Sequence, residues 1–130
     1  MLRNLADISR TILLVEPDEN VRAVTALAME AFGSIVVSVR TLTAAQAVLG
    51  DRPVGAIVSN AVLPDGTGDV LSKGDIPCIF MSADLETAGR LERRGMVCLK
   101  MPFPMSRLQN ALQAAIGGRS RRAAVEGNAG

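Results

Sequence analysis

The chain has 130 residues, and 48% of them are hydrophobic, which is enough to build the core of one domain. Its 14 basic and 13 acidic residues leave a formal charge of +1, so net charge gives no reason to expect a nucleic-acid or membrane partner. The chain has no histidine, which removes the usual general acid-base group and the commonest metal ligand and argues against an enzyme.

The two cysteines, Cys78 and Cys98, have neither the number nor the spacing of a disulfide framework or a zinc site. We expect both to be reduced thiols that fill space in the core. Residues 1–10 contain no apolar run typical of a signal peptide, and no segment approaches the ~20 apolar residues of a membrane span. These features predict a cytoplasmic protein.

The first half of the chain alternates short apolar runs with segments of helical spacing. Residues 11–15 (TILLV) do not alternate, which is typical of a strand buried on both faces of a parallel sheet. Asp18 is a suitable helix N-cap, and apolar residues recur at helical spacing from there until Gly33. The β-branched residues 35–39 predict a second strand, and residues 43–49 predict a second helix after a capping threonine.

The middle of the chain contains two more predicted strands, at residues 54–59 and 76–81. A turn at residues 64–66 (PDG) lies between them. From Gly68 to Asp75 there is room for only about one or two helical turns, whereas a parallel crossover normally takes a dozen or more residues. We therefore expect a shortened third helix.

The last part of the chain predicts a helix at residues 85–94, ended by Gly95, and a strand at residues 97–100. A final helix starts at Pro104 and keeps a clean apolar face until two glycines at 117 and 118. Beyond them the sequence has no apolar period and predicts a flexible tail. Three arginines in this tail are interpreted as solvated charges: Arg119, Arg121 and Arg122.

Alternating strands and helices predict an α/β domain with a parallel, doubly wound sheet and helices on both faces. We assign residues 1–10 to an N-terminal extension, 11–117 to the domain and 118–130 to the tail. In such sheets the functional crevice lies beyond the carboxyl ends of the strands, where the strand order reverses. The residues that follow the strands are therefore the candidate site residues.

Those residues resemble the motifs of a response-regulator receiver domain. Glu16-Pro17-Asp18 follows the first strand, and Asn60 ends the third strand, just before an LPDG turn at residues 63–66. Ser82 ends the fourth strand, and the fifth is followed by a PF pair at residues 102–103. The resemblance implies the flavodoxin-like fold with five parallel strands in the order 2-1-3-4-5, and a role in two-component or phosphorelay signalling.

The resemblance also implies a phosphoryl site, and three of its positions are altered here. Receivers use an acidic pair and an acceptor aspartate to hold magnesium and take a phosphoryl group, with a hydroxyl and a lysine that bind it. Alignment on the motifs puts Asn60 at the acceptor, Pro17 at the second acid and Met101 at the lysine. An amide is a poor nucleophile, and proline cannot bind metal. Only Glu16 and Ser82 remain of the family's set.

We call Glu16, Pro17, Asn60, Ser82 and Met101 the five phosphoryl-site positions. Each has an ordinary structural reading as well, as a turn residue, a loop rigidifier, a helix cap or core filler. The substitutions lead us to expect no catalytic residues, no cofactor, and weak or absent magnesium binding. Lys100 precedes Met101 and is expected to lie on the opposite side of its strand.

The leading hypothesis is a stand-alone receiver-like protein that binds a partner without being phosphorylated. The resemblance implies a histidine kinase, a phosphotransfer protein or an output protein as partner, and a second copy of the chain is a further candidate. Charges on the predicted fourth helix suggest the docking surface: Arg90, Glu92, Arg93 and Arg94. Two alternatives remain open, phosphorylation at Asp18 or Asp65, and binding of a small ligand in the crevice.

Overall fold

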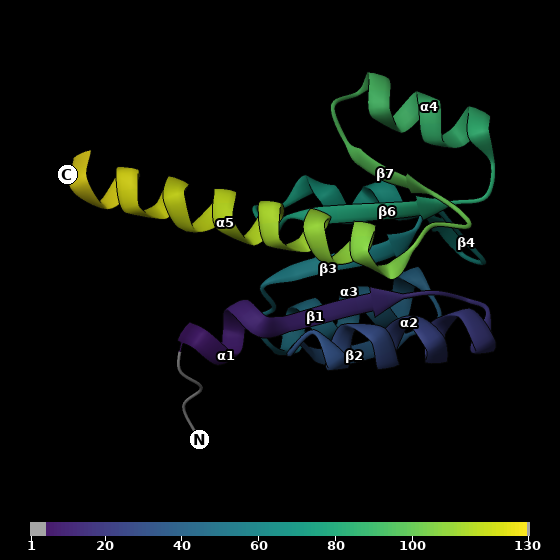
Figure 1. Ribbon diagram of the computed structural model, residues 1–130, viewed down its shortest axis with the longest axis horizontal. Helices are drawn as coiled ribbons and strands as arrows, with labels where there is room; N and C mark the ends of the chain where they lie inside the picture. Colours follow the sequence, from purple (N-terminus) through teal and green to yellow (C-terminus); the bar gives the residue numbers. More distant parts are fainter. Residues whose placement is uncertain (1–4, 130) are drawn as a thin grey trace.

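The computed structural model describes the backbone of residues 5–129 and the side chains of residues 5–118. Its core is a five-stranded parallel sheet with the order β2-β1-β3-β6-β7 (Figure 1). Numbered by parallel strands alone, this is the predicted order 2-1-3-4-5, so the predicted flavodoxin-like fold is confirmed. The five strands are β1 (Thr11–Val15), β2 (Ile35–Val39), β3 (Ala56–Asn60), β6 (Cys78–Ser82) and β7 (Val97–Lys100).

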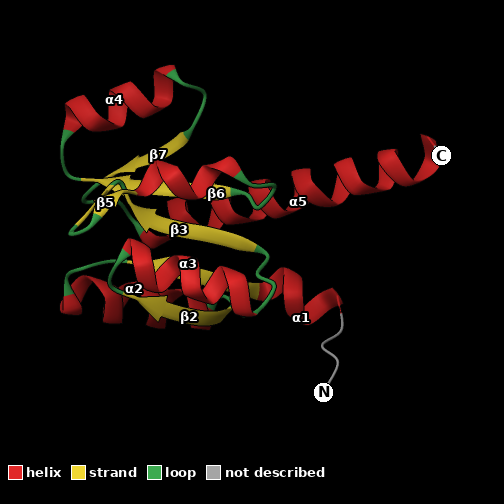
Figure 2. Cartoon of the chain, turned by 180° about the vertical axis from the view of Figure 1, so that it is seen from behind, coloured by secondary structure: helices red, strands yellow, loops and turns green. Residues whose placement is uncertain are grey.

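Strand β1 is buried along its whole length, as the unbroken apolar run predicted. Its side chains divide between two clusters on opposite faces of the sheet. Ile12 and Leu14 pack with residues of α2 (Glu19–Ala31) and α5 (Met105–Ala129). Leu13 and Val15 pack with residues of α3 (Leu42–Asp51). Figure 1 shows α5 on the near side of the sheet. Figure 2 views the molecule from behind and shows α3 on the opposite side.

The helices begin where the sequence offers capping side chains. Asp18 accepts a hydrogen bond from the Val21 N–H at the start of α2, and the Thr41 hydroxyl accepts one from the Ala44 N–H at the start of α3. Helix α4 (Leu85–Arg93) packs on the edge strand β7 and has Arg94 as its C-cap. Gly95 follows with a positive φ of 81°, as is usual just past a helix end.

The predicted shortening of the third crossover is confirmed. Residues 62–67 form a small antiparallel hairpin of β4 (Val62–Leu63) and β5 (Gly66–Thr67) around the predicted turn. The crossover helix that follows is only the short 3-10 helix η1 (Gly68–Lys73). It still supplies a core residue, since Leu71 is buried against the cluster under α3.

Both ends of the chain differ from the prediction. Leu5–Arg10 in the N-terminal extension forms the short helix α1, and residues 1–4 lie outside the described residues. Helix α5 does not end at the two glycines but continues to Ala129, because the alanines, arginines and glutamate that follow are good helix formers. The tail arginines have side chains outside the described part of the chain. Among the described residues, no helix is long and apolar enough to cross a membrane.

Candidate functional site

The register of the sheet brings Glu16 and Asn60 together. Val15 on β1 lies opposite Ser59 on β3, so the residues that follow them are neighbours at the carboxyl edge of the sheet. The Asn60 Nδ2 donates a hydrogen bond of 3.0 Å to the Glu16 Oε1. The backbone N–H of Asp18 donates one of 2.9 Å to the Glu16 Oε2. Glu16 is only 2% exposed, so its charge depends on these donors.

Both ends of the Asn60 amide have a partner. While its nitrogen donates to Glu16, its oxygen accepts a hydrogen bond of 3.1 Å from the backbone N–H of Val62. The amide therefore joins the end of β1 to the start of the β4–β5 hairpin. A carboxylate at this position could accept from Val62 but would face the Glu16 carboxylate without a proton to donate.

Pro17 lies in a loop that an arginine of α2 holds. The Arg22 Nη1 donates hydrogen bonds of 2.8 Å to the carbonyl of Glu16 and 3.3 Å to that of Pro17. Sequence reasoning missed Arg22. Its position was a usable signal, because a cation in the first turn of a helix opposes the helix dipole and needs a compensating contact.

The Ser82 hydroxyl is engaged in the turn that starts α4. It accepts a hydrogen bond of 3.1 Å from the Asp84 N–H, and the Ser82 side chain is nearly buried. Asp84 in turn caps α4 through the backbone N–H groups of Glu86 and Thr87 and through the Thr87 hydroxyl. The pKa of Asp84 is lowered, mainly by the hydrogen bond from the Thr87 hydroxyl.

Lys100 and Met101 diverge at the end of β7, as predicted. The exposed Lys100 side chain extends toward α4, where its Nζ lies 3.7 Å from the Glu92 carboxylate. Met101 is half-buried and packs against the core cluster under α2 and α5. Its backbone N–H donates to the Ser82 carbonyl at 2.8 Å. A thioether therefore lies at the position where the resemblance implies a cation.

The two alternative acceptors, Asp18 and Asp65, both serve as helix caps. Asp18 caps α2. Asp65, in the β4–β5 turn, accepts hydrogen bonds from the backbone N–H groups of Leu42 and Thr43 and from the Thr43 hydroxyl. The Thr43 hydroxyl, followed by these N–H groups, lowers the pKa of Asp65 to about 2. Asp65 thus belongs to the start of α3.

The residues at the phosphoryl-site positions do not fit the magnesium ion that receivers use. Magnesium prefers several hard oxygen ligands, and the one acidic side chain among the five positions is that of Glu16. Both of its oxygens accept hydrogen bonds, and the Asn60 oxygen accepts one as well. In the part of the chain that the structure describes, no group of three or more His, Cys, Asp or Glu side chains could hold a metal.

Met101 instead borders an apolar cavity of about 310 Å³ that the sequence analysis did not foresee. The cavity lies between α2 and the segment that joins β7 to α5. Its residues come from three separate parts of the chain, and no local motif links them. The sequence predicts Met101 as core filler, and only the fold shows that the packing around it is incomplete.

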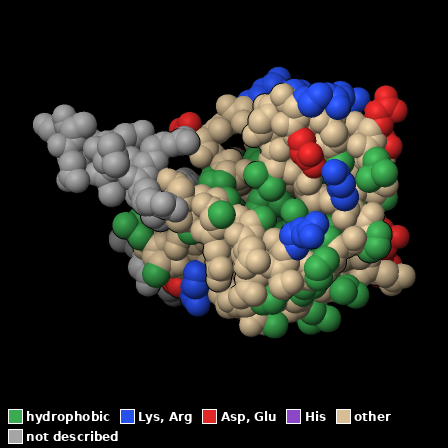
Figure 3. Space-filling view, turned by 45° about the horizontal axis from the view of Figure 1, so that its top comes forward, with side chains coloured by type: hydrophobic (Ala, Val, Ile, Leu, Met, Phe, Trp, Pro, Cys, Tyr) green, Lys and Arg blue, Asp and Glu red, His purple; other side chains and the backbone are tan. Residues whose placement is uncertain are grey.

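The four predicted docking residues are all exposed on or beside α4. Basic side chains line the upper rim of the molecule in Figure 3, where α4 lies. Arg94 forms an ion pair of 2.9 Å with Asp69, and Glu92 pairs with Lys100. Arg90 and Arg93 have no ion pair within residues 5–118.

Both cysteines are free thiols, as predicted. Cys78 lies at the start of β6, and burial raises its pKa to about 11. Burial also raises the pKa of Cys98, which is packed under α4. Thiols that resist deprotonation are weak nucleophiles, so these two residues are structural.

Comparison with known proteins supports the fold. No protein-family model and no curated protein matches the sequence. A response-regulator receiver domain from Clostridium thermocellum aligns with a TM-score of 0.76 at 17% identity, covering 85% of this chain and 96% of that one. A sensor protein from Polaromonas sp. JS666 aligns with a TM-score of 0.73 at 23% identity, covering 84% of this chain and 97% of that one.

A further similar structure is described as an adenylate cyclase from Rhodopirellula baltica. It aligns with a TM-score of 0.77 at 23% identity and covers 90% of this chain and 94% of that one. Neighbours with such different descriptions share an architecture, and an architecture does not fix an activity. The strand order and these alignments together give the conclusion that the chain has the fold of response-regulator receiver domains.

Proposed function

We propose that this chain is a non-enzymatic, receiver-like protein of two-component or phosphorelay signalling that binds a partner without being phosphorylated at the usual position. The observation that carries the proposal is the hydrogen bond from Asn60 to Glu16. It places a neutral amide, already bonded at both ends, at the position where the resemblance implies the phosphoryl acceptor.

The surroundings of Asn60 support the same proposal. Phosphoryl transfer relies on positioned cations that offset the charge of the moving group. Met101 brings no charge, and Lys100 extends toward α4. With a single acidic ligand at the phosphoryl-site positions, magnesium binding is proposed to be weak or absent.

The exposed α4 surface is the proposed docking site for a histidine kinase, a phosphotransfer protein or an output protein. Arg90 and Arg93 are exposed and have no ion pair among the described side chains, so they are available to acidic groups of a partner. Two exposed apolar side chains, Leu85 on α4 and Val97 on β7, add hydrophobic area beside these charges. This combination matches an interface with a polar rim.

Phosphorylation is tested with acetyl phosphate and magnesium, followed by intact mass measurement. The proposal predicts no acid-labile phosphoryl adduct under conditions that label an ordinary receiver run in parallel. An adduct would contradict it. Repeating the reaction with Asp18→Asn and Asp65→Asn then shows whether one of the alternative acceptors carries the group.

Partner binding is tested by capture from the source cell with and without phosphoryl donor. The double variant Arg90→Glu/Arg93→Glu should lose the captured signalling protein, and the donor should make no difference. Arg40→Glu is the matched control, because Arg40 is an exposed arginine that follows β2 at the opposite edge of the sheet. Equal loss in both variants, or capture that requires the donor, would overturn the proposal.

A further inference from the structure

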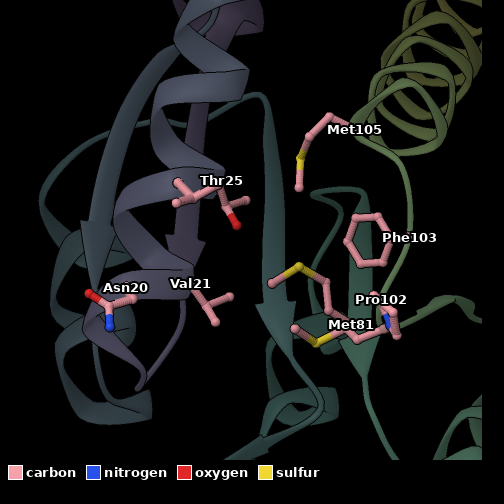
Figure 4. A pocket seen from close by; sticks show the side chains of 9 residues that line it. Asn20, Val21, Thr25, Met81, Pro102, Phe103 and Met105 are labelled. Atoms are coloured by element: carbon pink, nitrogen blue, oxygen red, sulfur yellow. The ribbon is translucent and has the colours of Figure 1, made fainter.

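The apolar cavity between α2 and the β7–α5 segment is a second candidate site, separate from the α4 surface. Three stretches of the chain enclose it, as Figure 4 shows. One is the first half of α2, one is the end of β6, and one is the segment from β7 into α5. The lining residues are Asn20, Val21, Val24, Thr25, Met81, Met101, Pro102, Phe103 and Met105.

No lining residue carries a charge. The cavity has flexible thioethers of three methionines on one side and the Phe103 ring beside them. Met81 is fully buried, whereas Val24, at 59% exposure, lies where the cavity meets solvent. A charged ligand would lose its hydration here without gaining an opposite charge, so the lining favours a neutral, mostly hydrocarbon molecule.

One hydroxyl group in this lining, that of Thr25, opens onto the cavity. Thr25 is only 2% exposed, and no side-chain hydrogen bond among the described residues 5–118 involves its oxygen. In Figure 4 the Thr25 oxygen points toward the methionines across the cavity. Because this oxygen faces the cavity, a ligand with a matching polar atom would bond it there in place of water.

We propose that this cavity binds a small neutral molecule, mostly hydrocarbon, that carries one polar group in hydrogen-bonding reach of Thr25. Its volume of about 310 Å³ lies at the lower end of the range for ligand pockets, which suits one or two fused rings or a short chain. The proposal does not depend on partner binding at α4, since the two surfaces involve different residues.

Indole is a suitable probe, with a hydrocarbon ring system and one N–H. Because the chain has no Trp or Tyr, the fluorescence of indole can be followed without protein background. We expect a saturable blue shift on titration with the full chain. With ¹³C-methyl methionine labelling, the methyl signals of Met81, Met101 and Met105 should move together. Met96 lies outside the cavity and should stay in place.

Two variants test the role of the hydroxyl and of the cavity. Thr25→Val keeps the shape but removes the oxygen, so indole should bind about 3- to 10-fold more weakly while 1-methylindole is unaffected. Met101→Lys places an ammonium group at the cavity and should abolish binding of both probes. Because Met101 is only half-buried, the lysine head group can reach solvent and the variant is expected to fold.

Three results would overturn the proposal. One is the absence of a saturable response to either probe up to its solubility limit. Another is an equal movement of the Met96 signal, which would indicate nonspecific association. The third is unchanged indole binding in both Thr25→Val and Met101→Lys.

Discussion

At Asn60 one side-chain amide links three segments of the chain, because it donates to the residue after β1 and accepts from the hairpin that follows β3. The chemistry of this position follows from the difference between an amide and a carboxylate. The Asn60 Nδ2 donates a hydrogen bond of 3.0 Å to the buried Glu16 carboxylate. An aspartate would instead place a second negative charge beside that carboxylate.

We predict that Asn60→Asp destabilises the protein at pH 7 by about 1–3 kcal/mol, the cost of leaving a buried polar group without its partner. The repulsion is relieved when one carboxyl of the pair takes up a proton. The penalty should therefore be full at neutral pH and shrink as the pH falls toward the ordinary carboxyl pKa of about 4. Urea unfolding followed by circular dichroism at pH 7 and pH 4 measures both effects.

Asn110→Asp, at an exposed position of α5, is the matched control and should leave the unfolding free energy unchanged. Asn60→Asp should also remain unlabelled by acetyl phosphate, because Pro17 and Met101 still deny it a metal site and a cation. Efficient magnesium-dependent labelling of this single variant would show that those two positions matter less than we propose. The triple variant with Pro17→Asp and Met101→Lys is the complete attempt at repair.

At the scale of elements, the β4–β5 hairpin is attached to α3 and to the end of β3 by specific contacts. Asp65 holds the first N–H groups of α3, and the Gly68 N–H donates to the Ala61 carbonyl at 2.9 Å. These contacts fix the segment in which Asn60 lies. Residues far from Asn60 in the sequence therefore control its position.

Asp65→Asn should lower the stability of the protein at neutral pH. It should also make that stability change less as the pH falls from 5 to 2. The pKa of Asp65 is lowered to about 2 in the folded state, so its contribution is present above the unfolded pKa of about 4 and is lost as the pH falls toward 2. Denaturation midpoints between pH 2 and pH 5 measure the difference. Identical acid profiles for the wild type and the variant would rule out this role of the cap.

Gly68→Ala should destabilise the protein by about 1–3 kcal/mol, because overpacking forces the backbone to shift. A Cβ at Gly68 would lie 2.6 Å from the Asn60 carbonyl oxygen and 3.0 Å from the Ser59 hydroxyl. Gly74→Ala is the control, since a Cβ there meets nothing within 4 Å. Equal unfolding free energies for the two variants would contradict the close approach at Gly68.

The sequence predicted the elements well because their signals are local. The apolar run of β1, the caps Asp18 and Thr41, and the short space between Gly68 and Asp75 each specify structure within a few residues. The predicted end of α5 at two glycines is wrong, because strong helix formers follow the glycines and the helix continues to Ala129.

The candidate site was predicted only in part, because its contacts join distant segments. Motif alignment identified Glu16 and Asn60, but their hydrogen bond follows from the register of β1 against β3. The Arg22 contacts with the loop could have been inferred from its place in the first turn of α2. The cavity lined by Thr25 and Met81 depends on how α2 packs against the sheet, and it leaves no pattern in a single stretch of sequence.

At the scale of the whole molecule, both thiols report on how tightly one face of the sheet, the face under α3 and α4, is covered. Burial raises the pKa of Cys78 to about 11, and that of Cys98 is also raised, so few thiolates are present at pH 8 in the folded protein. We predict that Ellman's reagent reacts slowly with the native protein and rapidly with both thiols in urea. Fast stoichiometric reaction of the native protein would contradict the packing under α3 and α4.

At the carboxyl edge of the sheet, an amide, a proline and a thioether occupy the positions where the resemblance to receivers implies anions and a cation. Titration of the ¹⁵N-labelled protein with magnesium and beryllofluoride, a phosphoryl mimic, tests this most directly. We predict that the Asn60 side-chain amide and the backbone amides of Glu16 and Ser82 keep their positions at millimolar magnesium. A new set of signals for these three residues, in slow exchange and dependent on both reagents, would contradict the account.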